Sequence, residues 1–557
     1  MRNGRALLAI AVTLALLLPL PASITAPVRA ANGSLSTLES DMVASMNGTK
    51  VHGFATDLEN LTLLYPAYRS SGSAGGQAAA QWIVDKLKLM GLSAWKEDFL
   101  FTAWDLRSKP DLVIDSDGNM TTREDRFPLP SFDCEHLSWP TPINLTSDIV
   151  TLPLPSAASR YDIGTRPIDN QAWDIVNTTG KMLVIGREVR WNSLWEQQFL
   201  NKLDSQTPAA IIYVWSYSWT QPLEVMAISS AGGRPLGALE PYYWELGLPV
   251  GSLDVTDSQH LQAILGNGSP KGIMNILSVI STGAHSNVVA QINATSGSDA
   301  EVLVTAHYDS INGPGFCDNG AGVAGLLEIA DALGSAVGRG TYAPTVNIRF
   351  IAFAAEEFGM VGSVNYLGAH LADVHEIVSV VNLDCIGSDE MRLGHLGQGS
   401  STLTSLVMDA ANDLGVHVAD AEMGSSDHQT FSDPSQVASM YMNYWGMTTN
   451  IGSALSVPAV MLYSYPDLYS NAWSGEKVGW IHTKNDRSDQ STPSPWITKE
   501  NLTAHASVAV LSVMRLAGGS LGIVAPSVNW VPSLAIVMVM VAIAGIAFWA
   551  FARRQRH

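Results

Sequence analysis

The sequence repeatedly places a histidine or a carboxylate at the end of a short, strongly apolar run. Such runs cover residues 302–306 before His307, residues 345–355 before Glu356 and Glu357, and residues 377–383 before Asp384. Their length and branched side chains are typical of buried strands. Because ligands bind beyond the carboxyl ends of strands in open α/β sheets, the pattern predicts an α/β fold with a functional site at that edge.

Other polar residues extend this pattern in both directions along the chain. Asp309 follows His307 by two positions, and a loop rich in glycine and proline leads to Asp318. An apolar periodic segment, predicted to be a helix, begins at residue 320. Much later, His482 follows another short apolar stretch. An isolated His-x-Asp triplet is usually an ordinary surface turn, but its recurrence at several strand ends favours one shared polar site.

The side chains at these strand ends have the chemistry of metal ligands. The candidates are His307, Asp318, the Glu356/Glu357 pair, Asp384 and His482. Imidazole and carboxylate without sulfur suit zinc, with cobalt or manganese as substitutes. This set exceeds the needs of one open zinc site, but it fits two metal ions that share a bridging carboxylate. The unligated glutamate of the pair is then free to accept a proton from water, and Asp309 is placed to orient His307.

The overall composition limits the possible partners. The chain has 557 residues, which is too long for one core and suggests about two globular units. Its formal charge is −20, with only 31 basic residues. Such an acidic balance argues against nucleic-acid binding.

Both ends of the chain carry patterns that are typical of membrane targeting. Basic residues precede an apolar run at 6–20, and small residues follow it, which predicts a cleaved signal peptide at 1–31 with an uncleaved anchor as the alternative. Residues 531–552 are uncharged and long enough to cross a bilayer, and the basic tail at 553–557 should stay in the cytoplasm. We therefore expect a single-pass cell-membrane protein whose catalytic part is extracytoplasmic.

A change of pattern divides the intervening chain. The expected units are a first part of a catalytic domain at 32–139, a β-rich insert at 140–275, the catalytic domain proper at 276–516 and a linker at 517–530. Strand-like runs at 181–186 and 209–215 define the insert, which contains none of the candidate ligands. A further strand at 286–292 is expected to pair with the strand that ends at His307.

The three cysteines do not form a predictable framework. They are Cys134, Cys317 and Cys385, and an odd count in an exported chain indicates no systematic disulfide pairing. Cys385 directly follows Asp384, and neighbours on a strand point to opposite faces, which argues against thiolate ligation there. A Cys317–Cys385 disulfide is a minor alternative.

The motifs at the strand ends resemble those of the co-catalytic zinc exopeptidases of metallopeptidase family twenty-eight, which includes bacterial aminopeptidases and glutamate carboxypeptidases. The matching motifs are AHYDS at 306–310, DNGAG at 318–322, AAEEFGMVGS at 354–363, NLDCIG at 382–387, SDHQTF at 426–431 and IHTKND at 481–486. They occur in family order over about residues 280–515, and the combination is highly specific. The insert at 140–275 resembles a protease-associated domain.

The resemblance implies a three-layer α/β fold with a mixed central sheet flanked by helices. It also implies a role for each candidate residue. Asp318 bridges two zinc ions, His307 and Asp384 complete one zinc site, and Glu357 and His482 complete the other. Glu356 is the general base, and Asp309 orients His307 without binding metal itself. Several relatives carry a tyrosine before the last histidine, where this chain has Ile481. Tyr463, Tyr465 and Tyr469 are the alternatives for stabilising an oxyanion.

The activity that the resemblance implies is hydrolysis of peptides from one end. We expect an aminopeptidase, with a carboxypeptidase or a dipeptidase on the same scaffold as the alternative. A glutaminyl cyclase, which uses one zinc ion, and an inactive receptor-like ectodomain are less consistent with the complete ligand set. The expected partners are therefore peptide substrates, and the sequence does not indicate an oligomeric state.

The distribution of charge favours attack at the amino end. A carboxypeptidase needs a cation, usually arginine, to bind the substrate carboxylate. The plausible cations near the motifs are isolated: Arg392, Lys477 and Lys484. The Glu356–Glu357 pair, with Asp389 and Glu390, instead provides an acidic environment for an ammonium group. The segment at 436–449, rich in Met, Tyr and Trp, favours a large apolar first residue.

The expected topology leads to a first prediction. Protease added to intact cells should release an active fragment by cutting within residues 517–529, because that linker joins the catalytic domain to the membrane helix. Peptidase activity in the supernatant measures this release. Complete protection of the active domain in intact cells would contradict the expected topology.

Overall fold

The computed structural model describes residues 35–120, 125–134, 143–152, 170–186, 193–214, 248–253, 255–311, 313–388, 390–395, 401–422, 426–441, 449–464, 481–482, 486–489 and 497–518. The predicted signal peptide, transmembrane helix and cytoplasmic tail lie outside the described residues, as does nearly all of the predicted linker.

A mixed eight-stranded sheet organises the larger lobe. Its strands, in spatial order, are β1 (Ser93–Leu106), β10 (Ser278–Ile292), β12 (Asn347–Phe353), β11 (Glu301–His307), β13 (Ile377–Leu383), β16 (Ala459–Tyr463), β14 (Met391–His395) and β15 (Val418–Glu422). The four strands β12, β11, β13 and β16 are parallel, and every residue of β11, β13 and β16 is buried. Burial on both faces explains why these strands are continuous apolar runs.

One predicted strand pairing was wrong. β10 pairs with β1 and β12, and β12 separates it from β11. β11 is buried on both faces and takes a parallel partner on each side, β12 and β13. Neighbouring positions in the sequence therefore did not determine the partner of β11.

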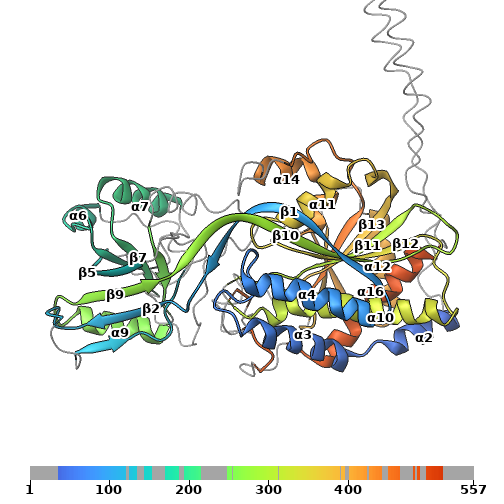
Figure 1. The fold of residues 1–557 in the computed structure, drawn as a ribbon, viewed down its shortest axis with the longest axis horizontal. Helices are drawn as coiled ribbons and strands as arrows, with labels where there is room; N and C mark the ends of the chain where they lie inside the picture. The colour runs from blue at the N-terminus through green and yellow to red at the C-terminus, as the bar shows by residue number, and fades with distance from the viewer. Residues whose placement is uncertain are drawn as a thin grey trace, which may run out of the picture.

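Helices cover the sheet on both faces (Figure 1). The helices of this lobe are α2 (Thr37–Ser45), α3 (Gly48–Thr62), α4 (Ala74–Leu89), α10 (Gly322–Gly338), α11 (Val361–Ala369), α12 (Ser401–Asp413), α13 (His428–Ser432), α14 (Pro434–Tyr441) and α16 (Lys499–Ala517), with a π-helical turn, η2 (Phe316–Ala321), before α10 and a 3-10 turn, η3 (Val374–Glu376), before β13. α3, α4 and α10 lie on one side of the sheet, and α11 and α14 on the other (Figure 1). The α/β class and the mixed sheet predicted from the sequence are confirmed.

The most apolar described helix belongs to this core. The stretch Phe316–Gly338 is long and apolar enough to cross a membrane by length and composition alone. Most of it is buried, however, and α10 packs against β11 and α3. A helix that is apolar nearly all round is typical of the interior of a large domain.

A second eight-stranded sheet forms a smaller lobe (Figure 1). Its strands, in spatial order, are β3 (Arg126–Pro128), β2 (Asp111–Asp115), β9 (Lys271–Ile276), β5 (Ile143–Thr151), β6 (Met182–Gly186), β7 (Ala210–Val214), β8 (Val250–Ser252) and β4 (Asp133–Cys134). The helices of this lobe are α6 (Asn170–Asp174), α7 (Ser193–Ser205) and α9 (Val255–Leu265). The long antiparallel pair β1–β10, paired from Ser93↔Gln291 to Leu106↔Ser278, runs between the two lobes.

The inserted lobe begins earlier than the sequence predicted. The expected boundary at residue 140 falls inside the second sheet, because β2, β3 and β4 already belong to it. β2 pairs along its whole length with β9, at the far end of the insert. These early strands are short and alternate with turns, so only their distant partners reveal them as part of a sheet.

Candidate metal centre

The ends of three parallel strands bring the predicted site residues together. His307 is the last residue of β11 and lies opposite Phe353, the last residue of β12. β13 is parallel to β11 on the other side and ends one residue before Asp384. The register therefore places the residues that follow β12 and β13 at the same edge as His307, as the sequence pattern predicted.

Two groups of potential ligands meet at Asp318. In the first, His307 Nε2 lies 3.1 Å from Asp318 Oδ1 and 3.4 Å from Asp384 Oδ1. In the second, His482 Nε2 lies 2.8 Å from Asp318 Oδ2 and 3.1 Å from Glu357 Oε2. The ligand atoms of each group lie within 4.8 Å of one another. Asp318 thus offers one carboxylate oxygen to each group, which is the arrangement of a bridging ligand.

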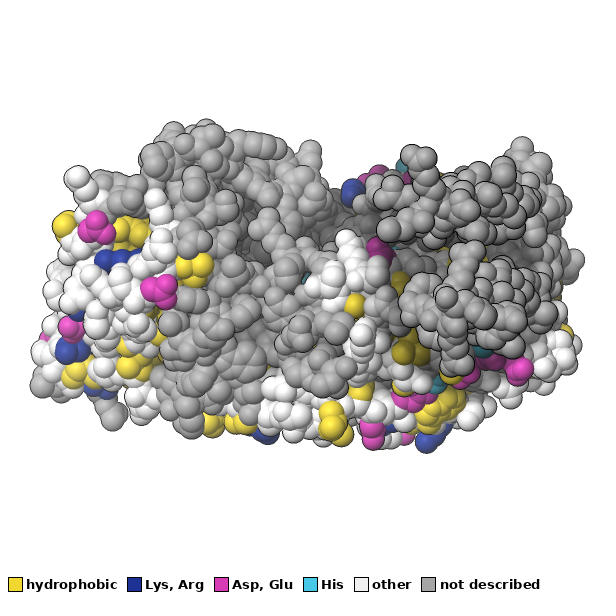
Figure 2. All heavy atoms as spheres, turned by 90° about the horizontal axis from the view of Figure 1, so that it is seen from above, with side chains coloured by type: hydrophobic (Ala, Val, Ile, Leu, Met, Phe, Trp, Pro, Cys, Tyr) yellow, Lys and Arg dark blue, Asp and Glu magenta, His cyan; other side chains and the backbone are white. Residues whose placement is uncertain are grey.

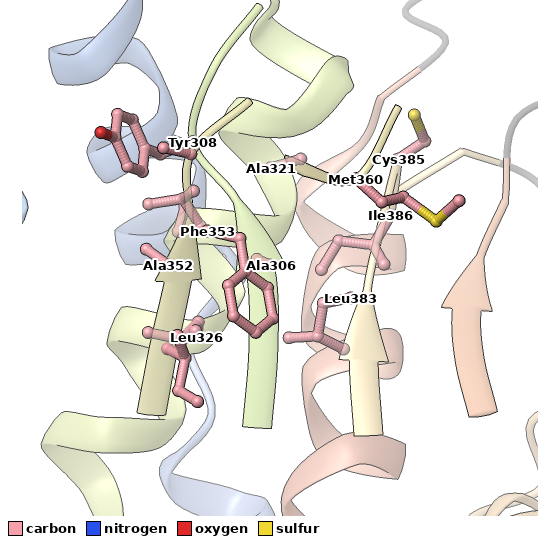
Figure 3. Packing of buried hydrophobic residues seen from close by; sticks show 14 of the residues in the cluster. Ala306, Tyr308, Ala321, Leu326, Ala352, Phe353, Met360, Leu383, Cys385 and Ile386 are labelled. Atoms are coloured by element: carbon pink, nitrogen blue, oxygen red, sulfur yellow. The ribbon is translucent and has the colours of Figure 1, made fainter. Parts of the chain in front are cut away.

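The site is enclosed by apolar residues. Ala306 and Leu383 immediately precede His307 and Asp384, and Phe353 is the last residue of β12. All three are completely buried, and they lie near the strand ends in Figure 3. Such a lining keeps water out and strengthens electrostatic interactions above it. Four of the predicted ligands, His307, Asp318, Glu357 and Asp384, are buried, and His482 is partly buried.

Electrostatics favour a cation in this position. Burial lowers the pKa of His307, but the carboxylates of Asp384 and Glu356 raise it. The charge effects together outweigh burial, so the pKa lies well above its usual value. The pKa of His482 is raised in the same way against burial, by Glu357 and Asp318. A field that attracts a proton to both imidazoles also attracts a divalent metal ion between them.

Unsatisfied polar atoms support the same conclusion. Among the described residues, Glu357 Oε1 and Asp384 Oδ1 are buried without a hydrogen-bond donor. A buried carboxylate oxygen without a partner is costly, so these atoms fit a bound cation. The donor set of two imidazoles and three carboxylates matches the ligands that zinc takes.

Asp309 connects the two halves of the site. Its Oδ1 lies 3.4 Å from His307 Nδ1, and the same carboxylate accepts hydrogen bonds from the backbone N–H groups of Glu356 and Glu357 at 3.1 and 3.4 Å. It therefore holds the turn that carries the two glutamates and faces the His307 ring.

Glu356 lies beside the two groups of ligands and belongs to neither of them. Burial raises the pKa of Glu356 well above its usual value; His307 lowers it, while the carboxylates of Glu357 and Asp427 raise it further. A glutamate that lies beside the ligands without being one of them is free to accept and return a proton.

Sequence reasoning did not assign a function to Asp486 or Asn319. Asp486 is completely buried, and its two carboxylate oxygens accept hydrogen bonds from the backbone N–H groups of Cys317 and Asp318 at 2.7 and 2.9 Å. Asn319 follows Asp318 through a cis peptide bond, and its side chain donates to the Leu383 carbonyl at 2.8 Å. Asn319 and Asp486 both lie within motifs that the sequence analysis singled out. The sequence did not indicate which backbone groups their side chains would bind.

Close packing beside Asn319 requires a glycine at the start of α10. A Cβ atom at Gly322 would lie 2.1 Å from Asn319 Oδ1 and 2.4 Å from the Leu383 carbonyl oxygen. The Gly322 N–H donates to that same Oδ1 at 2.9 Å. The glycine therefore lets α10 approach β13 closely enough to hold the loop that carries Asp318.

The cysteines beside the site are free thiols. Cys317 and Cys385 are both buried and form no disulfide, so the alternative of a disulfide between them is wrong for this structure. Burial raises the pKa of Cys317 to about 12. Neither cysteine is part of the two groups of ligands.

Comparison with known proteins agrees with this geometry. Residues 287–506 match Peptidase family M28. Probable leucine aminopeptidase 2 of Arthroderma benhamiae is 28% identical over 271 residues, covering 46% of this chain and 49% of the relative. Aminopeptidase YwaD of Bacillus subtilis is 37% identical over 141 residues, covering 24% of this chain and 30% of the relative. The chain thus spans about half the length, or less, of these curated relatives.

Solved structures share the fold. BSAP, a zinc aminopeptidase from Bacillus subtilis, superimposes with a TM-score of 0.56 at 18% identity, covering 85% of this chain and 96% of that structure. A Peptidase M28 precursor from Shewanella amazonensis SB2B gives a TM-score of 0.56 at 18% identity, with coverage of 86% and 96%. At this identity the likeness concerns the fold alone. In motif order and in the arrangement around Asp318, residues 287–506 of this chain are therefore similar to peptidase family M28.

Proposed function

We propose that this chain is a zinc-dependent aminopeptidase that removes N-terminal residues from peptides with two metal ions. The observation that carries the proposal is the position of Asp318, whose two oxygens face separate groups of a histidine and a carboxylate. A single-zinc cyclase has no need of this shared carboxylate. The names of the relatives, which include leucine aminopeptidases and zinc aminopeptidases, support the same activity.

The described side chains divide into ligands and a base. His307 and Asp384 would hold one zinc ion with Asp318, and Glu357 and His482 would hold the other. When bound, the zinc ions would polarise the scissile carbonyl as Lewis acids and lower the pKa of water, so that hydroxide is available as the nucleophile near neutral pH. Glu356, which belongs to neither group of ligands, would accept the proton of that water and deliver it to the leaving amine.

The surroundings of the site favour a substrate ammonium over a substrate carboxylate. Arg392 Nη2 lies 3.0 Å from Glu390 Oε2, so this arginine is already engaged with an acidic neighbour. Arg69 is completely buried and donates to backbone carbonyls. Lys477, Lys484 and Asp389 lie outside the described residues. The acidic character of the described site therefore supports cleavage at the amino end.

The stabiliser of the oxyanion and the side-chain preference belong to the proposal as well. Of the three candidate tyrosines, Tyr463 ends β16 and is buried, whereas Tyr465 and Tyr469 lie outside the described residues. The segment at 436–449, which is described only in part, is proposed to favour a large apolar first residue.

The proposal extends to location and partners. We infer peptide substrates, a protease-associated-like role for the inserted lobe, and attachment to the cell membrane by residues 531–552 with the catalytic domain outside. On the face in Figure 2, the basic side chains that are coloured lie scattered, several of them beside acidic ones.

Removal of the shared carboxylate is the sharpest test of the metal centre. The unmodified protein should bind two zinc ions per chain, and Asp318→Ala should lose both, because each group of ligands depends on one of its oxygens. Metal analysis by mass spectrometry after gel filtration measures the stoichiometry. Asp299→Ala, at an exposed carboxylate before β11, is the matched control and should keep both ions. Two zinc ions in Asp318→Ala would exclude the bridging role.

Substitution of Glu356 tests whether this residue acts as a general base or as a metal ligand. Glu356→Gln should retain the zinc content of the unmodified protein but lower kcat by about 10²–10⁴-fold, because the amide cannot accept the proton. Zinc analysis and steady-state kinetics on leucine p-nitroanilide give the two values. A kcat close to that of the unmodified enzyme would assign proton transfer to another residue.

Substrate polarity is tested with blocked peptides. Leucine p-nitroanilide should be hydrolysed and its N-acetylated form should not, because the acidic site needs a free ammonium group. Amidation of the C-terminus of a short peptide should leave its cleavage unchanged. The reverse pattern, with tolerance of N-acetylation and failure on C-terminal amides, would support a carboxypeptidase instead.

A further inference from the structure

We propose that Arg69 and Ser71 are positioning residues that hold the two ligand-bearing loops of the metal centre in place. Both lie between α3 and α4, far outside the segment 287–506 that matches the peptidase family. The inference rests on the proposed metal binding and concerns how the metal-free protein keeps its ligands in place.

Arg69 joins the two ends of the loop between His307 and Asp318. It is completely buried. Its Nε donates to the Tyr308 carbonyl at 2.6 Å, directly after His307, and its Nη2 donates to the Gly315 carbonyl at 2.5 Å and to the Asp318 carbonyl at 3.2 Å. Nη1 donates to the Pro314 carbonyl. All three guanidinium nitrogens are therefore bonded to the backbone of one loop.

The planar shape of the guanidinium group explains why arginine is suited to this position. Its N–H groups point in fixed directions, so several carbonyls bound to it are held at fixed separations. A lysine would preserve the positive charge but supply only a point-like ammonium group. Because the contacts of Arg69 are with carbonyls and not with the ligand carboxylates, its role differs from charge neutralisation alone.

Ser71 fixes the other loop. Its Oγ accepts a hydrogen bond at 2.7 Å from the backbone N–H of Ala355, the residue immediately before Glu356 and Glu357. Ala355 has a positive φ of 56°, a conformation that residues other than glycine rarely adopt. Loss of the Ser71 hydroxyl would leave a buried N–H group unpaired at the turn that carries the second group of ligands.

The short segment that carries both residues is itself held firmly. Ser73 caps α4, and its Oγ accepts from the Gly76 N–H at 3.0 Å. Gly72 has a φ of 95°, and a Cβ atom there would lie 2.0 Å from the Cβ of Ala103 on β1. The Ser73 cap and the close contact of Gly72 with Ala103 hold this segment between α4 and the sheet. From this one segment, Arg69 contacts the first loop and Ser71 contacts the second.

The arrangement predicts different effects for the two residues. Arg69 supports the loop of Asp318, which serves both metal ions, whereas Ser71 supports the loop of Glu357, which serves one. Residues that position metal ligands typically contribute about 10–100-fold to metal affinity. We therefore expect Arg69→Lys to lower the affinity for both zinc ions by about this factor. Ser71→Ala should lower the affinity for only one of them.

Ser70 provides the matched control between them. It is buried like its neighbours, but among the described residues its Oγ has no hydrogen-bond partner. Ser70→Ala should therefore bind both zinc ions as the unmodified protein does. The three variants are compared in the full chain by competition for zinc with a chromophoric chelator, and the Tm of each metal-free protein is measured alongside.

The zinc affinities decide the outcome, because a purely structural role would lower the Tm without changing them selectively. Wild-type affinity for both zinc ions in Arg69→Lys and Ser71→Ala would overturn the inference, whatever happens to the Tm. If Arg69→Lys does not fold, Ser71→Ala decides alone: selective weakening of one ion supports the inference, and unchanged affinity overturns it. Failure of the unmodified protein to bind zinc would instead overturn the proposed function, and this inference with it.

Discussion

The crowding of carboxylates around Asp318 is the constraint on which the rest of the structure depends. Asp318, Glu357 and Asp384 are buried, and two imidazoles of the described residues, His307 and His482, share their ligand groups. Charges of one sign that are buried together are unfavourable unless cations or hydrogen-bond donors compensate them. The raised pKa values of His307 and His482 show the same demand for positive charge. A pair of divalent ions would satisfy it, and this links the fold to the proposed chemistry.

The fold meets this constraint by fixing the loops at both of their ends. Parallel strands deliver His307 and Asp384 to one edge of the sheet, and the register between β11 and β12 brings in the turn of Glu356 and Glu357. Backbone groups of these loops are then bonded to buried side chains such as Asp309 and Asp486. Ligands held in this way need little reorganisation when a metal binds, which favours affinity and a defined geometry.

The inserted lobe extends from the same framework, and its described residues belong to neither group of ligands. β1 and β10 leave the central sheet as one long antiparallel pair and continue toward the second sheet (Figure 1). The segment of Arg69 and Ser71 packs against β1, through Gly72 and Ala103. The strand that leads toward the insert therefore also supports the segment that we propose to position the metal loops.

The sequence by itself determined the residues at the strand ends. A buried strand is a local pattern, so a polar residue at its end can be recognised without knowledge of its neighbours, as for His307, Glu357 and Asp384. Only the tertiary structure decided that β12 lies between β10 and β11, that the insert begins at β2, and that each oxygen of Asp318 faces a different histidine. It also brought Arg69, Ser71 and Asp486 to the loops. Their contacts join segments that are far apart in the chain, and neither hydrophobic periodicity nor local motif spacing encodes such a pairing.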